Sequence, residues 1–128
     1  MWFRERRRVK ARRQHLAEVA DRIGARTGLV LKESHTGGAG IGNSPVSMGI
    51  ITLRPGSPDE VAQAQIDAAV RAGYVRPPTP PCGKRVGCLF HGQPDLPMLS
   101  IVTYAPGERS SAFQPVPDGH TVVIISLA

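Results

Sequence analysis

Apolar residues recur at helical spacing near the start of the chain and predict a helix over residues 3–24. From Leu16 to Ile23 they follow the i, i+3, i+4, i+7 spacing that is typical of a helix with one face in a core. From residue 4 to residue 15, by contrast, just two residues are apolar. We therefore expect the helix to dock through its C-terminal half, to end near Gly24, and to leave its N-terminal half in solvent.

Two stretches with strand composition follow, at residues 29–33 and 48–53, and together they predict a hairpin. The residues between them, 36–44, contain four glycines in six positions and superficially resemble a nucleotide-binding loop. Phosphate binding by such loops needs a helix N-terminus directly after the glycines, and here Pro45 and a strand follow instead. We interpret the glycines as a flexible hairpin loop.

A second helix is predicted from its start signals. Ser57 has the position of an N-cap, Pro58 that of the first helical residue, and Glu60 that of the third residue in a capping box. The apolar spacing continues as far as Gly73, which predicts the end of the helix.

Three more strands are expected, around residues 86–90, over 99–104 and over 121–127. The unbroken apolar centre of the last one predicts an interior strand covered on both faces. Residues 77–81 form a proline-rich spacer, and residues 105–119 are expected to be a long loop. The order α-β-β-α-β-β-β predicts a single α+β domain, a two-layer sandwich with two helices on a mostly antiparallel sheet.

The charge of the chain is concentrated at one end. Residues 1–13 hold seven basic residues and one acidic residue, whereas the remaining chain holds nine of each, so the net charge of +6 belongs to the first thirteen residues. The expected organisation is a basic helical segment, residues 1–26, on a neutral body, residues 27–128. Arginine outnumbers lysine by 13 to 3, and its planar fork suits contacts with phosphate or carboxylate.

This asymmetry favours a binding protein whose N-terminal helix contacts a polyanion, with nucleic acid as the expected partner and an acidic protein surface as another. No helix-turn-helix, zinc-finger or RNA-recognition signature is present, so phosphate contacts without base readout are expected. The candidate contacts are Arg4, Arg6, Arg7, Arg8, Lys10, Arg12 and Arg13.

A second interpretation makes the same helix a protein–protein or homo-oligomer interface. Its apolar positions Trp2, Phe3, Val9 and Leu16 would then form the contact. Trp2 and Phe3 beside arginines are also compatible with base stacking or with a membrane surface.

A third interpretation is a thiol- or metal-dependent activity at Cys82, Cys88 and His91. Reduced thiols, a disulfide, and zinc with His35 or His120 as fourth ligand all remain open, although the spacing matches no standard zinc motif. The two cysteines could be bridged only if the glycines between them allow the chain to curl.

Apart from this cysteine and histidine cluster, the residue patterns contain no recognised catalytic motif, which favours a protein that is not an enzyme. The four histidines are isolated, and Ser110-Ser111 lacks the frame of a nucleophile elbow. We expect a non-enzymatic cytoplasmic protein with no cofactor, no secretory signal and no membrane span.

Overall fold

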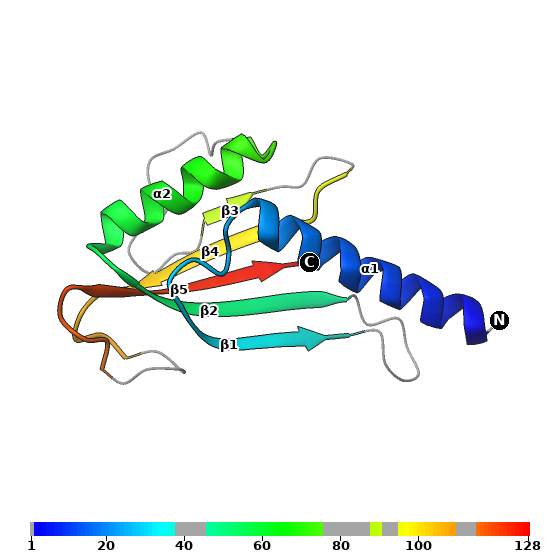
Figure 1. Ribbon diagram of the computed structural model, residues 1–128, viewed down its shortest axis with the longest axis horizontal. Helices are drawn as coiled ribbons and strands as arrows, with labels where there is room; N and C mark the ends of the chain where they lie inside the picture. Colours follow the sequence, from blue (N-terminus) through cyan, green and yellow to red (C-terminus); the bar gives the residue numbers. More distant parts are fainter. Residues whose placement is uncertain (1, 38–45, 76–87, 91–94, 110–114) are drawn as a thin grey trace.

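The computed structural model describes residues 2–37, 46–75, 88–90, 95–109 and 115–128. Its elements follow the predicted order and confirm an α+β fold (Figure 1). They are α1 (Trp2–Arg22), β1 (Leu29–Thr36), β2 (Ser47–Pro55), α2 (Pro58–Arg71), β3 (Cys88–Phe90), β4 (Leu99–Tyr104) and β5 (His120–Leu127). Residues 38–44 of the glycine loop and the whole proline spacer lie outside the described residues.

The strands form one sheet in the order β1-β2-β5-β4-β3, and every described pairing is antiparallel. Four strands have six to nine residues and β3 has three. The predicted hairpin is confirmed, because β1 pairs with β2 from Leu29↔Leu53 to Thr36↔Ser47. The strand β5 is central, as its apolar sequence predicts, and pairs with both β2 and β4.

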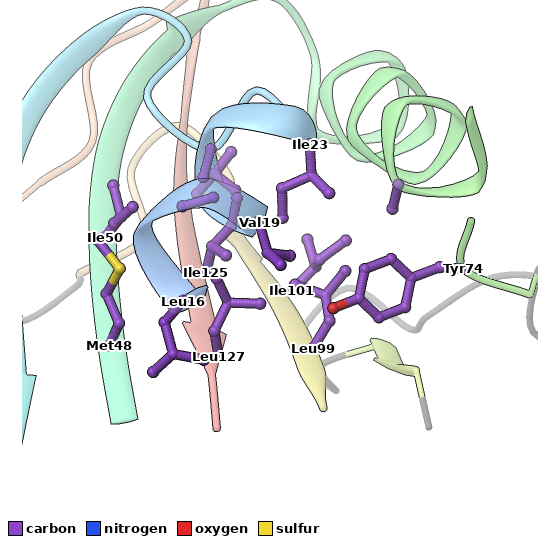
Figure 2. Packing of buried hydrophobic residues seen from close by; sticks show 14 of the residues in the cluster. Leu16, Val19, Ile23, Met48, Ile50, Tyr74, Leu99, Ile101, Ile125 and Leu127 are labelled. Carbon is purple, nitrogen blue, oxygen red and sulfur yellow. The ribbon is translucent and has the colours of Figure 1, made fainter. Parts of the chain in front are cut away.

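Both helices pack on the same face of the sheet, which makes the fold a two-layer sandwich. In the register of the central strands, Ile50, Ile125 and Ile101 lie side by side on that face, and all three belong to the main core cluster. Four residues of α1 or its C-terminal turn are completely buried against them, namely Leu16, Val19, Ala20 and Ile23 (Figure 2). The predicted docking of α1 through its C-terminal half is therefore confirmed.

The helix ends match their signals in the sequence. Gly24 has φ of +65°, the left-handed conformation that glycine adopts without strain, and the Ala25 N–H donates to the Ala20 carbonyl across the turn. At the start of α2, the Ser57 hydroxyl accepts the Glu60 N–H at 3.2 Å, which satisfies one of the unpaired donors of the first turn.

One expectation about β5 is wrong in part. Its helix-facing residues and Val122 on the opposite face are fully buried, but Ile124 is only partly buried and Ser126 is exposed. The second face of the strand is thus covered at one end only, because both helices pack on the first face.

Candidate nucleic-acid interface

We name residues 4–13 of α1 the basic segment. In Figure 1 this part of α1 extends beyond the ends of β1 and β2, so it lies at one tip of the molecule. The main hydrophobic anchors of α1 begin only at Leu16, and within the basic segment Val9 is the residue that packs, partly buried, against the core. The helix therefore holds its charged half away from the body.

Six of the seven predicted phosphate contacts have exposed side chains, and Arg12 is half-buried. At about 100° per residue, Arg7 and Lys10 lie on the side of α1 opposite the buried stripe that contains Leu16. Arg4 and Arg8 lie on one flank and Arg6 and Arg13 on the other. The charges therefore surround the helix rather than forming one narrow face.

Two members of the basic segment interact with the body. The Arg13 Nη2 group donates to the Gly37 carbonyl at 3.4 Å, at the end of β1. Arg12 lies on the side of the buried stripe and acts electrostatically on Tyr74, where its positive charge opposes the larger effect of burial, which raises the pKa of Tyr74 to about 12. Arg12 and Arg13 are thus less free to reach a partner than Arg7 or Lys10.

The described ion pairs involve a cation outside the basic segment. In the part of the chain that the structure describes, the ion pairs join Arg26 to Asp21 and to Glu33. No described carboxylate forms an ion pair with Arg4, Arg7, Arg8, Lys10, Arg12 or Arg13. Most of the positive charge of the segment is therefore not neutralised within the described residues.

The structure corrects the predicted protein interface at Leu16. This side chain is completely buried in the chain's own core, so it has no surface to offer a partner. Val9 is partly buried by the same core, and the side chains of Trp2 and Phe3 lie outside the described part of the structure.

The predicted thiol and metal ligands are not assembled by the described residues. Cys82 and His91 lie outside them, and of Cys88 only its place at the start of β3 is described. His120 Nδ1 lies 3.0 Å from the Asp118 carbonyl, His15 Nε2 lies 3.0 Å from the Asp95 carbonyl, and His35 is exposed on β1. Among the residues described, no group of three potential ligands is close enough to hold a metal ion. Ser110 and Ser111 also lie outside them.

Arg54 is a buried arginine that the residue patterns alone did not identify as a functional or structural residue. Arg54 of β2 is 6% exposed, and burial lowers its pKa to about 10. Its Nε group donates to Thr52 Oγ1 at 3.0 Å, and its Nη2 group donates to the Ala25 carbonyl at 3.2 Å. Gln65 of α2 donates to the neighbouring Ile23 carbonyl at 2.6 Å. Both side chains thus cap the end of α1. The only sequence signal for the role of Arg54 is its place in β2, where the alternation of the strand turns its charged side chain toward the helices.

In comparisons of this chain with protein-family models, with curated proteins and with solved structures, nothing matches. Neither helix, over the residues that are described, carries an apolar stretch long enough to cross a lipid bilayer.

Proposed function

We propose that this protein binds nucleic acid through the basic segment of α1, by contacts with the phosphate backbone and without base readout. The observation that carries the proposal is the exposed N-terminal half of α1, in which Arg4, Arg7, Arg8 and Lys10 form no ion pair with a described carboxylate. A helix that presents such cations on several sides can neutralise several phosphates of one duplex.

The placement of the cations also supports an external partner. Cations near a helix N-terminus oppose the helix dipole by about 0.3–1 kcal/mol each at low salt, and Arg4, Arg8 and Arg12 repel one another at i, i+4 spacing. Phosphate groups beside this end of α1 would relieve both effects, because they are anions at the positive end of the helix.

The distribution of exposure refines the list of contacts. Arg4, Arg7, Arg8 and Lys10 are exposed and without a described partner, so we assign them the main part of the binding. Arg6 is exposed and makes a contact within the chain, Arg13 reaches the hairpin, and Arg12 is half-buried. These three would supply weaker contacts.

The proposal is tested by fluorescence anisotropy with a labelled DNA duplex. The variant Arg7→Gln/Lys10→Gln removes two charges on the side of α1 opposite the core, and Lys32→Gln/Arg109→Gln removes two exposed charges from the body. Each lost phosphate contact weakens binding by about eightfold at 0.1 M salt, so we expect a loss of roughly 60-fold in the first variant and little change in the second.

Duplexes of unrelated sequence should bind with equal affinity. Equal losses in the two variants would show that net charge alone governs binding and would contradict a site on α1. Unchanged binding in the first variant would exclude the basic segment as a nucleic-acid interface.

A further inference from the structure

A hollow of about 360 Å³ lies where the C-terminal ends of α1 and α2 meet. Its lining residues are Arg22 at the end of α1, Arg71 at the end of α2, and the small side chains of Ala68 and Ala72. Two arginines from different helices thus border one space, which is large enough for a small ligand.

The usual structural task of an arginine in the last turn of a helix is to donate to unpaired terminal carbonyls. Here other donors already serve six of the carbonyls next to the two arginines in sequence, and three more in the turn after α1. At the end of α2, the carbonyls of residues 68–70 accept the N–H groups of residues 72–74. At the end of α1, the carbonyls of residues 19–21 accept hydrogen bonds from the N–H groups of residues 23–25. The carbonyls of residues 23–25 in turn accept hydrogen bonds from the side chains of Gln65 and Arg54.

Neither arginine is neutralised by a described acidic residue. Within the ranges that the structure describes, Arg22 and Arg71 take part in no ion pair. Asp67 lies one turn before Arg71 and accepts a hydrogen bond from Gln63 at 2.9 Å. Glu18 lies one turn before Arg22 and forms no ion pair with a described residue. Two like charges therefore border the hollow without a described counter-ion, and their mutual repulsion would fall if an anion lay between them.

We propose that Arg22 and Arg71 bind a phosphate group in this hollow. The planar guanidinium group donates two parallel hydrogen bonds to phosphate, and the methyl groups of Ala68 and Ala72 leave room for it. Residue 22 lies about 13 Å beyond residue 13 along α1, so the site is separate from the basic segment and does not depend on the function proposed above. The phosphate could belong to a free phosphate compound or to a nucleic-acid backbone.

Binding is tested by titrating the full chain with inorganic phosphate and following the NMR signals of the Arg22 and Arg71 side chains and of the Ala72 amide. We expect a saturable shift that sodium chloride at equal ionic strength does not reproduce. Either Arg22→Gln or Arg71→Gln should weaken binding at least about tenfold, since each removes a charged hydrogen-bond donor to the phosphate. A shift that chloride reproduces, or one that survives in the double variant, would overturn the proposal.

Two further variants separate a binding effect from a general one. Ala72→Leu fills the hollow without changing any charge, and it should weaken phosphate binding as well. Lys32→Gln/Arg109→Gln, which changes two distant exposed cations, should leave the titration unchanged. If Ala72→Leu binds phosphate as tightly as the original protein while its thermal unfolding is also unchanged, the hollow is not the site.

The source of the phosphate is distinguished by the same arginine variants in the DNA assay. If Arg22→Gln/Arg71→Gln also lowers DNA affinity and reduces the salt dependence by about two phosphate contacts, the site extends the nucleic-acid surface. If DNA binding is unchanged while phosphate binding is lost, the site serves a free phosphate compound. Loss of phosphate binding supports the site in both cases, and retention of it contradicts the site whatever the basic segment binds.

Discussion

Replacement of the buried Arg54 tests how the end of α1 is held against the sheet. Its guanidinium group donates to the Thr52 hydroxyl at 3.0 Å and to the Ala25 carbonyl at 3.2 Å, with the Gly24 carbonyl at 3.5 Å. We consider Arg54→Met, which keeps the length and removes the charge, and Arg54→Lys, which keeps the charge and removes the planar fork.

The magnitude follows from two opposing contributions. Burial lowers the pKa of Arg54 from 12.5 to about 10, which corresponds to an unfavourable free energy of about 3 kcal/mol for the charged form. This cost is fully present below pH 10, where the folded and unfolded states are both protonated, and it declines above that pH. Against it stand two or three charged hydrogen bonds of about 1.5–3 kcal/mol each.

Arg54→Met removes the cost together with the hydrogen bonds. The difference between the two contributions is about 0–6 kcal/mol, so we expect the free energy of unfolding to fall by about 3 kcal/mol, the middle of that range. Arg54→Lys retains a buried charge that is more strongly hydrated than guanidinium and serves fewer acceptors. We therefore expect the lysine variant to be less stable than the methionine variant, although it is the chemically closer replacement.

The assay is urea unfolding at pH 7 followed by circular dichroism, with the slope of the transition compared among variants. In the Arg54→Met background, Thr52→Val should restore about 1 kcal/mol, because it removes a buried hydroxyl that has lost its donor. A lysine variant as stable as the original protein would refute this reasoning, since it would show that neither the fork nor the desolvation matters.

Three other predictions follow from the described contacts. Leu16→Ala should lower the free energy of unfolding by about 2–5 kcal/mol, and Val9→Ala by less, because Leu16 is completely buried and Val9 only partly; equal losses in urea unfolding would contradict the docking of α1 through its C-terminal half. Ser57→Ala should cost about 1 kcal/mol through loss of the bond to the Glu60 N–H, whereas a neutral result would show that this cap contributes nothing. Burial raises the pKa of Tyr74 to about 12, so Tyr74 ionises first in the unfolded state. Up to about 3 kcal/mol of stability is therefore lost as the pH rises from 10 to 12. Tyrosinate absorbance compared with Tyr74→Phe measures this pKa, and ionisation of Tyr74 near pH 10 would contradict its burial.

The local signals of the sequence predicted the elements well. Ser57, Pro58 and Glu60 act within one turn of helix, and Gly24 and Gly73 mark helix ends at which glycine has positive φ. The alternation in β2 and the apolar centre of β5 also placed these strands correctly, because their buried residues lie against a core that both helices share.

What the sequence did not predict depends on contacts between distant segments. Arg54 is buried because the end of α1, about thirty residues earlier, presents carbonyls beside it. Arg22 and Arg71 border one hollow only because the two helices end at the same place. The open end of the second face of β5 likewise follows from the packing of both helices on one side, which the apolar run of residues 122–125 does not reveal.

The salt dependence of DNA binding tests the central claim most directly. If about six phosphates are neutralised, the logarithm of the binding constant should fall with the logarithm of salt concentration at a slope near −5, and conversion of Arg4, Arg7, Arg8 and Lys10 to glutamine should bring that slope to about −2. The same slope in both proteins would show that these four exposed side chains touch no phosphate, and would contradict the account.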